Sequence, residues 1–334
     1  MCPESAGGNM FTRRTWLTAS GSLVGTLVAR GIPALAQDYP SKPVRVIVPY
    51  AAGGATDILA RLVATRIDQE LKQSVVIDNR GGGASQVGTQ AVATAPPDGY
   101  TIGMIDSAFT INPGLFAGKL PYDTRKDFAP VSLVATAPLV FVVHPSVEAK
   151  SAQELVALAR RKPGMTYALP GLGTPVHLAG EQLRQATGIE VVSVPYRGAG
   201  PSIADFIAGQ VQMTFATVPS ILEHVRAGRA RALAMVGERS PLLPDVPTMA
   251  EAGLPGVDAA LMFGLVAPAA TPAAVIKVLN ESAAASVRTD PLRARLIELG
   301  YLPIGSTAEE FRTRIAADIA KWSRIVEAAG IKPN

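Results

Sequence analysis

Short runs of valine and isoleucine alternate with segments of helical periodicity along most of this chain. Near the start, residues 44–49 and 75–78 are such runs, and an amphipathic segment at 57–71 separates them. A helix near 86–94 and a strand at 101–106 continue the order. This strand–helix–strand alternation predicts an α/β fold, in which largely parallel sheets are covered by helices.

The pattern changes once and then returns. Residues 128–143 hold two apolar runs that are split at Pro138, with no helical segment between them. From Ser151 the alternation resumes, with helices expected at 151–161, 174–187, 200–208 and 219–227 and strands at 166–168, 190–195, 213–217 and 230–236. A proline-rich connection then leads to one more apolar run, 261–267, and the remainder is helical, at 272–288, 290–299 and 307–329.

Two α/β units joined by two extended crossings, near 131–137 and 261–268, make one domain discontinuous. We expect residues 38–137 with 265–334 to form domain 1, and residues 138–260 to form domain 2. The chain has 334 residues, of which 48% are hydrophobic. That length and composition suffice for two buried cores and exclude a disordered chain.

The charge pattern argues against a nucleic-acid surface. Charged residues make up only 17% of the chain, and the formal net charge is +4. No run of basic residues is longer than the triplet 160–162. A nucleic-acid-binding face requires a denser basic patch than this.

The first 36 residues have the features of an export signal. Arg13 and Arg14 form a charged start, residues 17–29 are uncharged, and Ala34-Leu35-Ala36 is a cleavage site before Gln37. Thirteen weakly apolar residues are too few to span a bilayer, which needs about 20. The paired arginines are typical of the bacterial twin-arginine route. We therefore expect a periplasmic protein that begins at Gln37.

Two further points concern this segment. A short disordered tail is the alternative interpretation, and translation could start at Met10 instead of Met1. The single cysteine, Cys2, lies in the segment expected to be removed. Disulfide frameworks and cysteine metal sites are therefore excluded from the mature chain.

Glycine, serine and threonine dominate the loops at the expected carboxyl ends of the strands, where open parallel sheets bind ligands. Glycine lets a ligand approach the backbone, and free N–H groups at a helix N-terminus attract anions. Tight turn geometry alone could explain any single loop, but several in register favour a shared anion site. These loops are 49–57, 79–85, 106–112, 171–175 and 196–201.

The motifs of common enzymes are incomplete or absent. Residues 44–78 imitate a dinucleotide-binding unit, but Gly53-Gly54 is not G-x-G-x-x-G, and Gln86 replaces the third glycine of the next loop. There is no phosphate-binding P-loop and no nucleophile elbow around Ser107. The three histidines lack the spacing of a zinc helix. We expect no catalytic residue, cofactor or metal.

A few polar side chains near the loops remain candidates for ligand contact. His177 follows Thr174-Pro175 and is more readily a packing or polar contact than a catalytic base. Asp57 lies in the first turn of its helix, where it can stabilise the helix dipole or contact a ligand. Arg197 is the cation inside a glycine loop, either solvated or on a carboxylate, and Arg80 can brace its own loop.

Several segments, in order from about residue 38 to 330, are similar to one family. The opening Tyr39-Pro-x-Lys-Pro-x-Arg-Val-Ile-Val-Pro-Tyr-x-Ala-Gly-Gly-x-x-Asp57 resembles the start of mature Bug-type receptors, the extracytoplasmic substrate-binding proteins of tripartite tricarboxylate transport systems. The same resemblance extends to Val76-Ile-Asp-Asn-Arg80, Pro97-Asp-Gly-Tyr-Thr101, Gly173-Thr-Pro-x-His-Leu-Ala179, Pro195-Tyr-Arg-Gly-Ala-Gly-Pro201 and Pro244-Asp-Val-Pro-Thr-Met-Ala-Glu-Ala-Gly253.

The resemblance implies a two-domain type II periplasmic-binding-protein fold, or Venus flytrap, with two crossover strands. It also implies a small carboxylate held by backbone amides, hydroxyls and ordered water. Gly81-Gly82 stands where the family has a Pro-Gly pair, so the contacts of 81–85 do not carry over directly. By position, the implied ligand-binding residues are Ala52, Gly53, Gly54, Thr56, Asp57, Ser107, Gly173, Thr174, His177, Arg197, Gly198 and Ala199.

The sequence therefore favours a periplasmic receptor that closes on a small organic carboxylate about hinges near 135–139 and 258–266. Its partners would be the integral membrane subunits of a tripartite tricarboxylate-type transporter, and the receptor itself would be a monomer. Two alternatives stay open at this point. One is a secreted α/β enzyme such as an esterase or a dehydrogenase, and the other is a receptor that serves a sensor kinase.

Overall fold

The structure is a computed structural model that describes residues 39–50, 52–196 and 199–332. The export signal expected at residues 1–36, and the candidates Arg197 and Gly198, lie outside the described residues. Within the described ranges, every helix is too short or too polar to cross a membrane.

The first sheet has the order β11-β4-β10-β3-β1-β2. Its strands β1 (Val44–Val48), β2 (Val75–Asn79) and β3 (Thr101–Asp106) are parallel, as the strand–helix alternation predicts. Strand β10 (Leu261–Pro268) enters from far along the chain and runs antiparallel between β3 and β4 (Phe128–Ala137). The short β11 (Leu302–Pro303) completes the edge beside β4.

The second sheet has the order β7-β6-β8-β5-β9. It is built from one continuous stretch of chain, with strands β5 (Leu139–Val143), β6 (Met165–Leu169), β7 (Val191–Pro195), β8 (Met213–Thr217) and β9 (Arg231–Val236). Only Pro138 separates β4 from β5, so a single residue carries the chain from one sheet to the other. The return passes through residues 237–260 to β10.

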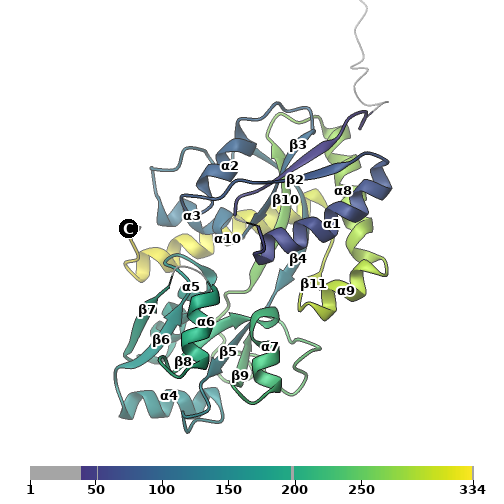
Figure 1. Cartoon of the computed structure of the whole chain (residues 1–334). Helices are drawn as coiled ribbons and strands as arrows, with labels where there is room; N and C mark the ends of the chain where they lie inside the picture. The colour runs from purple at the N-terminus through teal and green to yellow at the C-terminus, as the bar shows by residue number, and fades with distance from the viewer. Residues whose placement is uncertain (1–38, 51, 197–198, 333–334) are drawn as a thin grey trace, which may run out of the picture.

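Helices cover both faces of the first sheet (Figure 1). On one face, α1 (Ala55–Leu71), α8 (Ala273–Arg288) and α9 (Leu292–Glu298) enclose a core of aliphatic side chains. On the other face, α2 (Gln86–Ala93), α3 (Ala108–Leu115) and α10 (Ala308–Ala328) pack around a second core. Burial on both faces explains why these strands are continuous apolar runs and not alternating ones.

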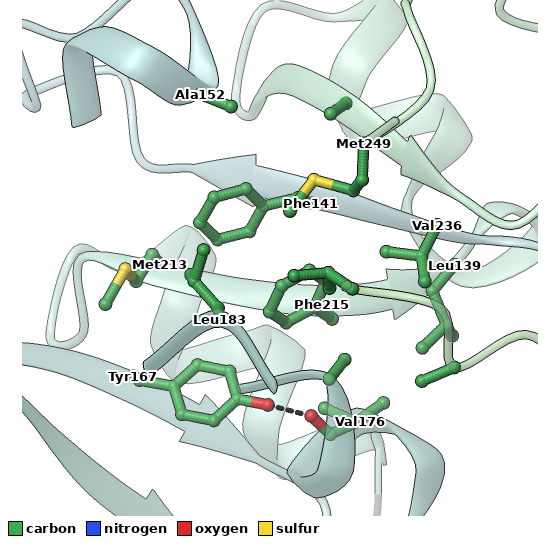
Figure 2. Packing of buried hydrophobic residues seen from close by; sticks show 14 of the residues in the cluster. Leu139, Phe141, Ala152, Tyr167, Val176, Leu183, Met213, Phe215, Val236 and Met249 are labelled. Carbon is green, nitrogen blue, oxygen red and sulfur yellow. Dashed lines mark hydrogen bonds between the residues drawn. The ribbon is translucent and has the colours of Figure 1, made fainter. Parts of the chain in front are cut away.

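The second sheet is covered in the same way. Helices α4 (Ala152–Arg161) and α5 (Pro175–Thr187) lie over one face, and α6 (Ala199–Ile207) and α7 (Val218–Arg226) over the other. Figure 2 shows the first of these cores, where the rings of Phe141 and Phe215 stack with centroids 4.4 Å apart.

The C-terminal helix α10 joins the cores of the two sheets. Phe311 and Ile315, in its first half, belong to a core of the first sheet. Trp322 and Val326, in its second half, are buried with the side chains of α4 and α5. In Figure 1 this helix runs between the first sheet above and the second sheet below. The two sheets are therefore connected by a packed helix as well as by the crossing strands.

Most expected elements are present with ends shifted by one or two residues, and the α/β fold class is confirmed. There are two exceptions. We expected residues 106–112 to be a loop, but β3 ends at Asp106 and helix α3 begins at Ala108, and the short strand β11 was not expected. Helix α3 was not predicted from the sequence because it contains Pro113 and Gly114, and both residue types disfavour helix interiors. Gly114 has a tertiary reason, since a Cβ there would lie 2.8 Å from the Cα of Ser323 in α10.

Candidate functional site

A cavity of about 290 Å³ lies where the loops of the two sheets face each other. Helices α1, α3, α5, α6 and α7 all begin at its wall, which matches the general position of ligand sites in open α/β sheets. The residues that line it are Tyr50, Ala55, Ala84, Asp106, Ala108, Asn112, Leu115, Pro170, Leu172, Gly173, Thr174, Pro175, Val176, Ala199, Ser202, Ile203, Phe215, Ala216, Thr217, Ser220 and Leu261.

Hydrogen bonds to Asp57 stabilise the loop before α1. Its carboxylate accepts hydrogen bonds from the backbone N–H of Gly53 at 2.8 Å, from Arg61 Nε at 3.0 Å and from Asn79 Nδ2 at 2.9 Å. Burial alone would raise the pKa of Asp57, but these donors together hold it below its usual value. Gly53 takes φ +89°, a conformation that glycine adopts without strain. Asp57 therefore stabilises the loop without lining the cavity.

Helix α1 begins at the cavity without a side-chain cap. Gly54, at the N-cap position, has extended backbone (φ −78°, ψ 169°) and no side chain to donate or accept. Ala55, the first residue of the helix, lines the cavity. The helix α7 is similar, because Thr217 at its N-cap makes no side-chain capping bond and lines the same cavity. The first N–H groups of a helix need partners from outside it.

Helix α5 differs because the side chain at its N-cap, Thr174, accepts one of its first N–H groups. The hydroxyl of Thr174 accepts the N–H of His177 at 3.3 Å, and His177 Nδ1 accepts the N–H of Gly173 at 3.0 Å. Burial lowers the pKa of His177, so the ring is neutral, with its proton on Nε2. His177 is thus part of the turn that starts α5.

Helix α3 is capped by Asp106, the last residue of β3. One oxygen, Oδ1, accepts the Tyr50 hydroxyl at 2.7 Å and the N–H of Ala108 at 2.9 Å. Burial raises the pKa of Asp106, and the hydrogen bonds from Tyr50 and Ala108 offset only part of that rise. Next to it, Ser107 Oγ accepts the N–H of Met262 at 2.9 Å and is buried. Ser107 therefore fastens β10 to the end of β3.

Some of the ligand-binding residues that the resemblance implied line the cavity, and others do not. Gly173, Thr174 and Ala199 line the cavity. The positions that are not in the lining lie in the loops that frame the cavity or in the first turn of the helix that follows, and they are Ala52, Gly53, Gly54, Thr56, Asp57, Ser107 and His177. For Asp57, Ser107 and His177, the hydrogen bonds above account for the side chains.

Sequence reasoning missed the polar residues Tyr50, Asp106, Asn112, Thr217 and Ser220, which line the cavity. Tyr50 and Asp106 lie inside two of the loops singled out for their glycines, so their polar side chains were the available signal. Thr217 ends β8 in the way that Asp106 ends β3. A search for polar residues at every strand end would have found Asp106 and Thr217, whereas Asn112 and Ser220 lie inside helices α3 and α7.

Apart from Ser202, the rest of the wall is apolar. Leu115, Leu172, Ile203, Phe215 and Leu261 come from both sheets and their helices. Gly173, at φ +72°, brings this loop against Leu115 of α3, since a Cβ at residue 173 would overlap that side chain. The cavity therefore suits a small molecule with an apolar body and at least one polar group.

Two α/β sheets with a ligand-sized cavity between their loops define the class of two-lobed solute-binding proteins. Residues 59–331 match the model of the tripartite tricarboxylate transporter family receptor, and the chain belongs to that family. The resemblance in the sequence is thereby confirmed, and with it the function of a periplasmic solute-binding receptor.

Individual relatives agree along almost the whole chain. Protein BugT of Bordetella pertussis is 35% identical over 317 residues, which cover 93% of this chain and 97% of BugT. A protein of R. palustris solved with adipate has a TM-score of 0.80 at 35% identity, over 89% of this chain and 100% of that one. MatC from Rhodopseudomonas palustris, with bound malate, has a TM-score of 0.75 at 29% identity, over 86% and 100% of the two chains.

Proposed function

We propose that this receptor captures a small organic carboxylate in the cavity and delivers it to the membrane subunits of a tripartite tricarboxylate-type transporter. The observation that carries the proposal is the pair of uncapped helix N-termini, α1 and α7, at the wall of one cavity. Such N-termini attract anions through their N–H groups and the helix dipole. The adipate and malate in two related structures support the same ligand class.

The family resemblance assigns the carboxylate to the loop at 52–56 on the first sheet and to the loop at 197–199 on the second, of which residues 197 and 198 lie outside the described residues. The uncapped start of α7 lines the same cavity and would supply further N–H groups. Two observations support the first loop: the carboxylate of Asp57 accepts the Gly53 N–H, and Ala55, the first residue of α1, lines the cavity. Thr174 gives the cavity wall a polar side chain but no donor for the ligand, because its hydroxyl donates to the carbonyl of Gly171 at 2.8 Å.

Closure of two lobes completes the site. The proposed lobes are residues 38–137 with 265–334, which include the first sheet except the start of β10, and residues 138–260, which include the second sheet. Because α10 contributes to the cores on both sides, we expect it to act as the pivot while the crossings near 135–139 and 258–266 bend. Small-angle scattering should give a smaller radius of gyration with ligand, and an unchanged radius at saturation would contradict closure.

The receptor binds its ligand without transforming it. The side chains that could act as acid, base or nucleophile are bound within the frame of the cavity, as for His177 and Ser107. Incubation with the bound ligand, followed by chromatography, should recover it unchanged. Any turnover would overturn this part of the proposal.

The identity of the ligand class is tested by native mass spectrometry of protein purified directly from the periplasm. We expect a monomer with one retained anion, whose mass and fragmentation identify a carboxylic acid. Calorimetry with that acid and with its methyl ester then measures what the carboxylate contributes. Equal affinity for acid and ester would refute a carboxylate site.

The export route has a separate test. The mature protein should begin at Gln37, after cleavage behind Ala36, and should reach the periplasm by the twin-arginine pathway. Replacing Arg13→Lys together with Arg14→Lys should stop export, which cell fractionation would detect. Export of the double variant at the normal level would refute the twin-arginine assignment.

A further inference from the structure

The two uncapped helices at the cavity, α1 and α7, cover different sheets, and one short turn contacts both of them. The turn is residues 299–301, which lead from the end of α9 to β11 on the first sheet. These three residues do not line the cavity. The turn therefore reaches the two helices from outside the ligand site.

Gly300 lies against the first turn of α7. A Cβ at residue 300 would be 2.9 Å from Cδ of Pro219 and 3.2 Å from its backbone nitrogen. Pro219 lies between Thr217 and Ser220, which both line the cavity. A proline ring is rigid, so a side chain at residue 300 would have to displace the start of α7. Glycine allows the two backbones to approach this closely.

The next residue, Tyr301, contacts the first turn of α1. Its hydroxyl donates to the carbonyl of Ala55, the first residue of α1, at 2.9 Å, and Ala55 lines the cavity. The Tyr301 ring is buried and packs edge-on against Phe263 of β10, with the ring centroids 5.6 Å apart. Burial raises the pKa of Tyr301 to about 12, so the hydroxyl keeps its proton and stays a donor.

Backbone hydrogen bonds fix the turn at the end of α9. The N–H of Gly300 donates to the carbonyl of Ile297 at 2.9 Å, and the N–H of Tyr301 donates to that of Leu296 at 2.9 Å. This pair of bonds, with Gly300 at φ +82°, is the Schellman motif of helix ends. The turn is thus anchored to the first sheet by its own backbone and by the Tyr301 ring.

We infer that Gly300 and Tyr301 are positioning residues for ligand binding, because their turn sets the spacing between the N-termini of α1 and α7. The inference rests on the proposed function, in which N–H groups of these two helices hold a carboxylate. Groups that share one ligand need to be held within about 0.5 Å of the productive geometry. The contact between Gly300 and Pro219 joins the two proposed lobes, so closure forms it and opening breaks it.

The test compares Gly300→Asn with Gly228→Asn. Gly228 ends α7 in the same motif, at φ +68°, with its N–H on the carbonyl of Val225 and the next N–H on that of His224. A Cβ at residue 228 would have no atom within 4 Å. Asparagine is the residue after glycine that this left-handed position accepts. Both variants therefore carry a similar backbone cost, and Gly300→Asn alone displaces the start of α7.

The probe is the tightest binder among adipate, malate, hexanoate and benzoate, measured by calorimetry on the whole protein after dialysis. Gly300→Asn should bind it about tenfold more weakly, which corresponds to the loss of one hydrogen bond to a charged group. Gly228→Asn should stay within about twofold of the unchanged protein. The melting temperatures of the two variants should fall by similar amounts, so a difference in affinity reports positioning and not stability.

Two further measurements separate closure from a local defect. In stopped-flow experiments the loss in Gly300→Asn should come from faster dissociation of the probe, because the open protein presents unchanged loops. Small-angle scattering should show less compaction by the probe in this variant than in Gly228→Asn. Tyr301→Phe keeps the ring on Phe263 but loses the bond to Ala55, and it should weaken binding roughly threefold to tenfold.

Other outcomes overturn the inference. If Gly300→Asn and Gly228→Asn bind the probe equally, or if the probe compacts both to the same radius of gyration, the turn does not position α7 and the proposed function stands. If Gly300→Asn does not fold, Tyr301→Phe decides, and an unchanged affinity there refutes the role of the turn. If none of the four acids binds the unchanged protein, the proposed function fails and the inference fails with it.

Discussion

The helices that begin at the cavity fall into two groups. In α3 and α5, a side chain accepts one of the first N–H groups: Asp106 accepts that of Ala108 in α3, and Thr174 accepts that of His177 in α5. In α1 and α7, no side chain caps the first turn. All four follow loops with similar small residues, so loop composition alone does not reveal which helix can bind an anion.

The largest effect should come from filling the approach to α1. Gly54→Val places a branched side chain at the uncapped N-terminus, where the extended backbone tolerates it. Losing two or three hydrogen bonds to the ligand should weaken binding roughly a hundredfold. Calorimetry with the retained ligand measures the change.

The matched control is Gly171→Val in the loop before α5. A Cβ at residue 171 meets only the methyl group of Thr174, at 3.7 Å, and the residue is not in the cavity lining. Its affinity should stay within about twofold of the original, well below the 1.4 kcal/mol that a tenfold change represents. Similar losses in both variants would show that α1 and α5 do not differ as the caps indicate.

An intermediate effect, on stability, is expected from the loss of the Asp57 carboxylate. Asp57→Asn removes a charge that Arg61, Asn79 and the Gly53 N–H all contact. Hydrogen bonds to a charged group contribute about 1.5–3 kcal/mol, so thermal unfolding should occur at a clearly lower temperature.

The pH dependence of this variant follows from the lowered pKa of Asp57. A carboxyl group with a lowered pKa in the folded state stabilises the protein above its usual value of 3.8, and that contribution is lost as the pH falls below it. The difference in melting temperature between the two proteins should therefore be largest near neutral pH and shrink below 3.8. A constant difference across this range would contradict the assigned role.

A smaller effect should follow the removal of the α5 cap. Thr174→Val keeps the size of the side chain but no longer accepts the N–H of His177. Loss of an N-cap costs about 1 kcal/mol of stability, while ligand affinity should hardly change. A large loss of affinity with an unchanged melting temperature would place Thr174 on the ligand and weaken the comparison of the helices.

The smallest effect should come from salt. Binding by oriented N–H groups inside a closed cavity is poorly screened, so affinity should fall by roughly twofold or less between about 0.02 and 0.3 M salt. A steep, continuing fall would indicate that exposed cations dominate recognition. Calorimetry across a salt series with the retained ligand separates these cases.

Local patterns predicted the fold well because strand and helix periodicity are properties of neighbouring residues. The site was harder because its details depend on contacts between distant positions. Asp57 was a candidate for the ligand, but its bond to Asn79 crosses from α1 to β2. Asp106 looked like an ordinary loop residue because helix α3 was missed, and Gly114 makes sense only once α10 is in place.

The position of β10 in the first sheet has a consequence for synthesis of the protein. The second sheet is complete once the ribosome has made residue 236, whereas β3 and β4 of the first sheet must wait for residues 261–268 to fill the gap between them. Until then both strands expose unpaired edges, which favour aggregation. Chains truncated between residues 236 and 261 should therefore contain a complete second sheet and an incomplete, aggregation-prone first sheet. Such chains should depend heavily on chaperones.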